Sequence, residues 1–141
     1  MMHPRTLLLA TAFLVAAQGA RAEPPTTFDG TWNITMTCPP HSGDDDAKGY
    51  THRFPGEVTK GELRAVHGAE GEPGWHLVTG TIAADGSATL RVEGIVNNAA
   101  YAINGAPRGK AYRYRVKASF EASSGSGERL TGRTCHFGFA R

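Results

Sequence analysis

The chain has 141 residues, of which 40% are hydrophobic and 20% are charged, with 15 Lys and Arg against 13 Asp and Glu. This length suits one domain after a short leader and excludes a second domain of ordinary size.

Residues 1–22 are predicted to form a secretory signal peptide. Arg5 supplies the positive start, residues 6–17 form an apolar run, and residues 20–22 give a small-x-small cleavage pattern. The run is shorter than the roughly 20 apolar residues of a spanning helix, and no Cys follows the cleavage pattern, so we expect no membrane anchor. Cleavage after residue 22 would deliver the chain to the periplasm or the extracellular space.

Removing this leader also removes the excess of positive charge. Arg5 and Arg21 are its only Lys, Arg, Asp or Glu residues, so 13 basic and 13 acidic residues remain. Residues 23–93 hold 11 acidic and 5 basic residues, whereas residues 94–141 hold 2 and 8. We expect this asymmetry to reflect complementarity between neighbouring strands, and the neutral exported chain argues against a nucleic-acid partner.

Glu23–Thr27 is a Pro-containing flexible leader, and residues 28–141 form a single domain in which apolar and polar residues alternate with the period of two of β-strands. In chain order, the first expected elements are a strand at 31–38, a strand at 50–54 that breaks at Pro55-Gly56, and a hairpin that turns at Lys60-Gly61. A strand at 75–83 follows, and an Asp85-Gly86 turn leads from it into a strand at 88–96. The remaining elements are a weak strand or ordered loop around Tyr101 and Ile103, a strand at 110–121, a flexible turn at 123–127, and a last strand that holds Cys135, Phe137 and Phe139.

Seven or eight short strands joined mostly by tight turns predict an all-β fold, an antiparallel up-and-down meander. Closure into a small barrel would leave no sheet edge exposed, whereas a two-sheet β-sandwich satisfies the same alternation and is the alternative. We expect a monomer.

Cys38 and Cys135 are the only cysteines and lie on the apolar faces of the first and last expected strands. An oxidising compartment favours a disulfide between them. Because that bond requires the two strands to be close in space, it supports barrel closure.

No residue pattern indicates a catalytic or metal site. Five histidines follow the leader, none at a metal-ligand spacing, and the acidic run Asp44–Asp46 lacks the alternation of a calcium loop. No G-x-S-x-G motif accompanies the serines. We therefore expect no enzyme activity, metal or cofactor; an enzyme acting on envelope material would need an inward acid or base such as His52 or Glu57.

Two sets of side chains are candidates for binding. An inward set comprises Trp32, Tyr50, His52, Tyr112 and Tyr114. These residues would either fill the core or line a ligand cavity. An outward set, Arg113, Arg115 and Lys117, forms a basic stripe that could meet a partner or pair with neighbouring acids.

Several short motifs resemble those of a group of small exported bacterial domains to which no activity is assigned. They are F-D-G-T-W at 28–32, R-F-P at 53–55, P-G-W at 73–75, Y-x-Y-x-V-x-A-x-F at 112–120 and G-R-x-C-x-F at 132–137. The G-T-W start and meander are similar in architecture to avidin-like and lipocalin-like barrels and to small periplasmic inhibitors. The resemblance implies an exported β domain. From the inward and outward candidate residues we expect a non-catalytic barrel that binds a small ligand or a partner or, alternatively, acts as an inhibitor or protein-interaction module.

Overall fold

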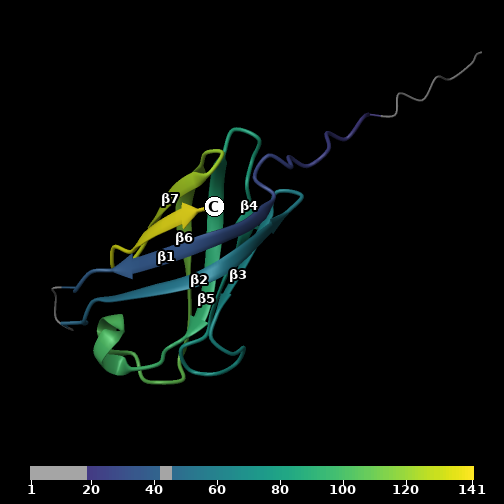
Figure 1. Ribbon diagram of the computed structural model, residues 1–141. Coiled ribbons are helices and arrows are strands. Elements are labelled where there is room, and N and C mark those ends of the chain that lie inside the picture. Colours follow the sequence, from purple (N-terminus) through teal and green to yellow (C-terminus); the bar gives the residue numbers. More distant parts are fainter. Residues whose placement is uncertain (1–18, 42–45) are drawn as a thin grey trace, which may run out of the picture.

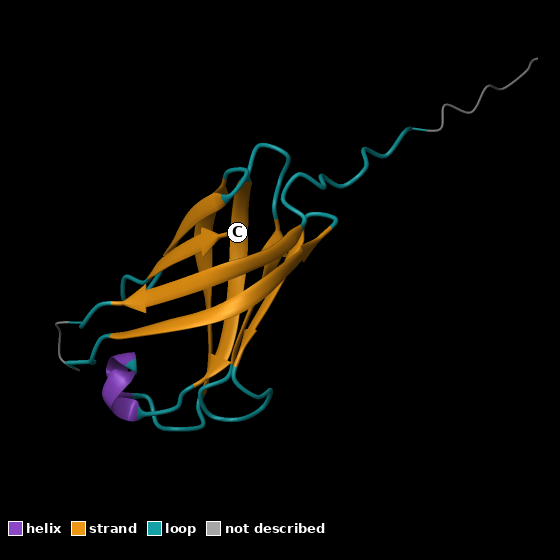
Figure 2. Ribbon diagram, in the orientation of Figure 1, coloured by secondary structure: helices purple, strands orange, loops and turns teal. Residues whose placement is uncertain are grey.

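A computed structural model describes residues 19–41 and 46–141 and shows a closed antiparallel β-barrel (Figures 1 and 2). Each strand pairs with the next along the chain, and β1 also pairs with β8. The predicted barrel is confirmed, and the sandwich alternative is excluded. The strands are β1 (Gly30–Cys38), β2 (Tyr50–Thr59), β3 (Glu62–His67), β4 (His76–Thr81), β5 (Ser87–Ile95), β6 (Ala111–Phe120), β7 (Ser124–Arg129) and β8 (His136–Ala140).

One end of the barrel is filled by aromatic side chains, and we call it the closed end. Trp32 is fully buried, its Nε1 donates a hydrogen bond to the Phe28 carbonyl at 2.8 Å, and its ring meets that of Phe120 at 5.4 Å. Phe120 in turn packs on Phe139, with ring centroids 4.6 Å apart. This ring cluster forms the dense part of the core.

The expected loose leader is held against the closed end near its junction with β1. Arg141 donates hydrogen bonds to the carbonyls of Thr27 at 2.8 Å and Asp29 at 2.6 Å, and its guanidinium lies 4.7 Å from the Trp32 ring. The Asp29 carboxylate accepts hydrogen bonds from both backbone N–H groups of the Lys60-Gly61 turn. The predicted signal peptide lies outside the described residues except for residues 19–22.

Two expectations about the strands are wrong. The predicted break at Pro55-Gly56 does not occur, and β2 runs through both residues. The hydrogen-bonded ladder between β2 and β3 begins at Gly56. Pro55, which has no N–H to donate, lies just outside that ladder and is therefore tolerated in the strand. The predicted flexible turn at 123–127 is largely strand β7. A side chain at Gly127 would meet Val116 at 2.8 Å, so the glycine lets the large inward residues of β6 fill the space.

The opposite end, which we call the open end, carries the longer connections. The segment from β5 to β6 contains two short 3₁₀ turns, η1 (Ala99–Tyr101) and η2 (Ile103–Gly105), and no strand around Tyr101. Figure 1 shows these turns beside the ends of β1 and β2. Of the predicted acidic run, Asp44 and Asp45 lie outside the described residues, and Asp46 is exposed.

The predicted disulfide between Cys38 and Cys135 is present and buried at the open end. It joins the end of β1 to the residue before β8, across a sequence separation of 97. Such a bond is typical of proteins in oxidising compartments. Among the described residues, no helix is long and apolar enough to cross a membrane.

We expect loss of the disulfide to lower the melting temperature strongly, because closing a loop of this length restricts the unfolded chain by roughly 4–5 kcal/mol. Thermal unfolding of the Cys38→Ser/Cys135→Ser variant, and of the native chain with reductant, measures the effect. The reductant should leave the double variant unchanged. An equal melting temperature for native and variant chains would contradict the prediction.

Candidate functional site

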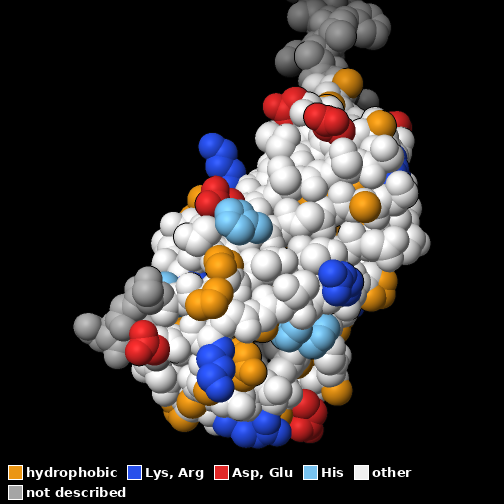
Figure 3. Space-filling model, turned by 60° about the vertical axis from the view of Figure 1, so that its left-hand side comes forward, with side chains coloured by type: hydrophobic (Ala, Val, Ile, Leu, Met, Phe, Trp, Pro, Cys, Tyr) orange, Lys and Arg blue, Asp and Glu red, His pale blue; other side chains and the backbone are white. Residues whose placement is uncertain are grey.

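A cavity of about 480 Å³ occupies the open end of the barrel. Its walls come from the ends of β1 to β4 and β6, the last residue of β7, and the loops that follow β5 and β7. On the face drawn in Figure 3, Lys and Arg lie beside hydrophobic side chains at the lower end of the molecule. The interior is thus filled by aromatic side chains at one end and hollow at the other, whereas the sequence left a filled core and a ligand cavity as alternatives.

Three tyrosines form the aromatic wall of this cavity. Tyr112 and Tyr114 alternate inward along β6 and stack with ring centroids 6.0 Å apart, while Tyr50 begins β2. The Tyr114 hydroxyl lies 3.5 Å from the Met36 sulfur, to which it donates. Burial, together with neighbouring tyrosines, raises the pKa of Tyr112 and Tyr114 well above the ordinary value, so both hydroxyls stay protonated and can donate hydrogen bonds.

Arg129, the last residue of β7, brings a positive charge into the cavity. Its guanidinium stacks on the Tyr114 ring at 4.0 Å, a cation–π contact. Its Nε is buried without a hydrogen-bond partner, and no carboxylate of the described residues pairs with it. Burial lowers the pKa of Arg129, yet a guanidinium keeps its charge at neutral pH. As far as the described residues go, the site therefore presents a cation without a counter-charge.

Arg133 has a different role, although it also borders the cavity. It is 2% exposed and donates hydrogen bonds to the carbonyls of Tyr101 at 2.7 Å, Pro39 at 2.5 Å and Lys48 at 3.1 Å. These carbonyls belong to the β1–β2 loop and to η1. Arg133 therefore joins its own loop, between β7 and β8, to the β1–β2 loop and to the segment between β5 and β6.

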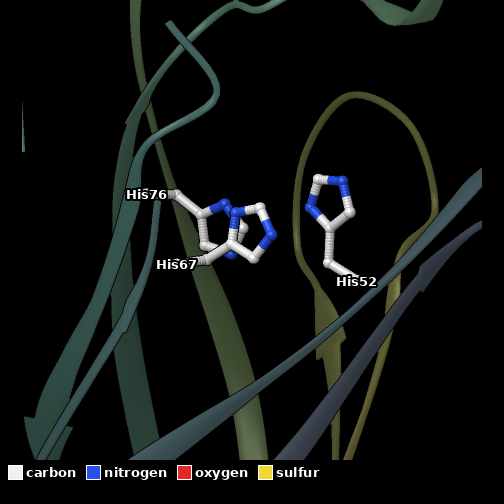
Figure 4. Close-up of side chains that lie close together, drawn as sticks. All are labelled: His52, His67 and His76. Carbon is white, nitrogen blue, oxygen red and sulfur yellow. The ribbon is translucent and has the colours of Figure 1, made fainter. Parts of the chain in front are cut away.

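Three histidines from adjacent strands form the opposite part of the wall (Figure 4). His67 and His76 are cross-strand partners on β3 and β4, and His52 of β2 stacks on His67 with ring centroids 4.2 Å apart. Burial, followed by the neighbouring histidines, lowers the pKa of His76 to about 3, and burial also lowers the pKa of His52. Both imidazoles are thus neutral at neutral pH.

The structure brings together four of the five residues of the predicted inward set. Tyr50, His52, Tyr112 and Tyr114 line the cavity. Trp32 does not, because its position at the start of β1 places it in the aromatic cluster of the closed end. The alternation of apolar and polar residues correctly predicted that these side chains point into the barrel, but it does not give their positions along the barrel axis.

Sequence reasoning missed His67, His76 and Arg129. His67 lies at the next inward position after Leu63 and Ala65, so the alternation of that strand could have identified it. Arg129 lies inward at the end of a Ser- and Gly-rich run that was interpreted as a turn. The approach of histidines from three strands depends on the pairing register, which no sequence spacing displays.

The predicted outward basic stripe is exposed on β6, but acidic residues lie among its neighbours. In the pairing register Arg113 stands opposite Glu93 and Lys117 opposite Glu128, while Arg115 stands opposite Arg91. Glu93 forms an ion pair with Arg91 rather than with the stripe. Glu57, one of the two inward acid or base candidates, is exposed on the outer face and accepts a hydrogen bond from Thr31.

Replacement of Arg133 by Met, which retains much of its volume, is expected to lower the free energy of unfolding by on the order of 3 kcal/mol. The reason is that the change removes hydrogen bonds from a charged donor to three backbone carbonyls. Chemical denaturation measures the loss, with Arg113→Met on the exposed face as the matched control. Equal stabilities of these two variants would contradict a joining role.

The free energy of unfolding should fall as the pH is lowered from 7 to 5. EDTA is present throughout so that traces of metal ions do not bind to the histidines. His76, packed against His52, His67 and Phe54, has a pKa of about 3 when folded and an ordinary value of 6.5 when unfolded. Below about pH 6.5 the unfolded chain therefore binds a proton at this residue that the folded chain does not bind. The free energy of unfolding then falls by up to about 1.4 kcal/mol for each pH unit.

Denaturation curves of the native chain and His76→Gln across this range isolate the contribution of His76. The variant should show the shallower dependence on pH, and His136→Gln on the outer face controls for the loss of an imidazole. Parallel pH dependences for native and His76→Gln chains would contradict the prediction.

Comparison with known proteins adds no functional information to this geometry. A scan of protein-family models and searches of curated proteins and of solved structures found no match.

Proposed function

We propose that this protein is an exported, non-catalytic barrel that binds a small anionic molecule with an apolar or aromatic body in the cavity of its open end. The observation that carries the proposal is the Arg129 guanidinium, which lies in the cavity wall without a carboxylate partner among the described residues. Export is supported by the signal-like leader and by the buried disulfide.

The size and lining of the cavity suit such a ligand. A volume of about 480 Å³ falls within the range of small-molecule sites, which is about 300–1,000 Å³. The tyrosine rings provide a flat apolar surface, and the protonated Tyr112 hydroxyl adds a donor to that of the guanidinium, while the Tyr114 hydroxyl donates to Met36. An anion with an aromatic body would satisfy the charge, the donors and the apolar wall together.

The charge of Arg129 argues for an anion rather than a neutral ligand. A partly buried cation has lost much of its hydration, and a bound carboxylate, sulfonate or phosphate would restore its hydrogen bonding. Gly132 leaves room for the guanidinium, since a side chain there would approach the Arg129 Nη2 within 2.9 Å. The loop after β7 is therefore compatible with an arginine directed into the cavity.

The two other functions considered have less support. The outward basic stripe is interleaved with acids, which weakens it as a docking surface for an acidic partner. An envelope-acting enzyme lacks one of its candidate groups, because Glu57 lies outside the barrel.

Anilinonaphthalene sulfonate, an aromatic anion that fluoresces in apolar sites, tests the proposal. The native chain should bind it at one saturable site, and Arg129→Gln should weaken binding by roughly tenfold, the loss of one charge-assisted hydrogen bond. Arg113→Gln, on the outer face, should bind as the native chain does.

Displacement of the probe distinguishes anion from neutral recognition. Aromatic carboxylates should compete better than the corresponding amides with the native chain, and this preference should vanish in Arg129→Gln. Cooperative melting of each variant establishes that the probe reports on a folded barrel. The proposal fails if the folded native chain does not bind the probe, or if Arg129→Gln leaves its affinity unchanged.

A further inference from the structure

The histidine cluster has the composition of a metal site, although its members share no sequence motif. His52, His67 and His76 each offer one ring nitrogen, and these three atoms lie within 4.8 Å of one another. Figure 4 shows His52 across from His67, with a ring nitrogen of each on the side of the other, and His76 beside His67. Three strands of the barrel wall supply the three side chains, so the backbone positions are fixed by sheet pairing.

Hydrogen bonding leaves nitrogens of the cluster unsatisfied. His76 Nε2 and His52 Nδ1 are buried and have no hydrogen-bond partner among the described residues. Buried polar atoms in folded proteins are nearly always paired, because an unpaired one costs about 1–3 kcal/mol. A core of ordinary structural histidines does not account for two such atoms in one cluster.

One hydrogen bond of His67 determines which of its ring nitrogens is free. Its Nδ1 lies 3.2 Å from the Gly74 carbonyl oxygen. Because a carbonyl can only accept, Nδ1 is the donor of this hydrogen bond, and Nε2 is the nitrogen that could bind a metal. This second hydrogen bond to a carbonyl is the arrangement that fixes the tautomer and orientation of metal-binding histidines.

We propose that His52, His67 and His76 bind one divalent transition-metal ion of the zinc class on the wall of the cavity. Three imidazoles without a thiolate favour zinc, copper or nickel over calcium or magnesium, which prefer oxygen ligands. The lowered pKa values of His52 and His76 keep these rings neutral and able to bind.

Binding requires a local rearrangement of the rings. Tetrahedral zinc with bonds of about 2.0–2.1 Å places its ligands about 3.3 Å apart, whereas the present nitrogens are separated by up to 4.8 Å. The rings are stacked with interplanar angles of 7° and 12°, so at least one must rotate. His52 and His67 are only partly buried and border the cavity, which gives them room, while His76 is fully buried. A fourth coordination position would face the cavity.

Zinc titration of the full chain, expressed with its own leader and purified without a histidine tag, tests this site. After treatment with EDTA, calorimetry should show one zinc ion per chain, and excess zinc should raise the melting temperature. His52→Gln and His67→Gln should each weaken zinc binding by at least about tenfold. Both variants change partly buried residues, so the test does not depend on the folding of a His76 variant.

His136→Gln on the outer face is the matched control and should bind zinc as the native chain does. Cobalt provides a second readout, because tetrahedral coordination by the three imidazoles should give a visible absorption band that both cluster variants lose. The proposal is overturned if the native chain binds no zinc, or if His136→Gln weakens binding as much as the cluster variants do. Arg129→Gln should keep its zinc stoichiometry, so this result is independent of anion binding.

Discussion

The pairing of β1 with β8 is the constraint on which the rest of the structure depends. Without it the meander is an open sheet with two exposed edges, and the inward faces of β1 and β8 have no common interior. The Cys38–Cys135 bond holds these strands together at the open end, and Arg133, two residues before Cys135, joins the neighbouring loops to the same region. The cavity therefore lies beside a disulfide and an arginine that connect the strands and loops around it.

Barrel closure also creates the difference between the two ends. Toward the closed end, Phe120 and Phe139 are the register partners of Gly125 on β7, and their rings pack on each other with centroids 4.6 Å apart, which leaves little space. Toward the open end, inward positions carry tyrosine, histidine and arginine, whose polar atoms require partners. Several of those atoms have none within the described protein, which is the common basis for the proposed anion and metal sites.

Much of the fold could be predicted from the sequence because alternation has a direct physical cause. The sequence runs that form β1, β5, β6 and β8 each bury one face. The strands and the barrel could therefore be predicted from the alternation of apolar and polar residues, and the disulfide from this alternation together with the predicted export. The Ser- and Gly-rich β7 escaped prediction because its small residues carry no apolar signal. The site was half predictable: Tyr112 and Tyr114 lie on the cleanest strand, whereas the approach of His67 to His76 and His52 depends on register between strands.

The separation of closed and open ends has a consequence for how such a protein can diversify. The aromatic residues of the closed end, Trp32, Phe120 and Phe139, do not line the cavity, whereas Met36 and Tyr114 belong both to the buried core and to the cavity wall. Substitutions at the partly buried cavity positions of β2 and β3, His52 and His67, therefore disturb the core less than substitutions at Tyr114. The packed end of the barrel can thus stay constant while the side chains at these positions around the rim vary.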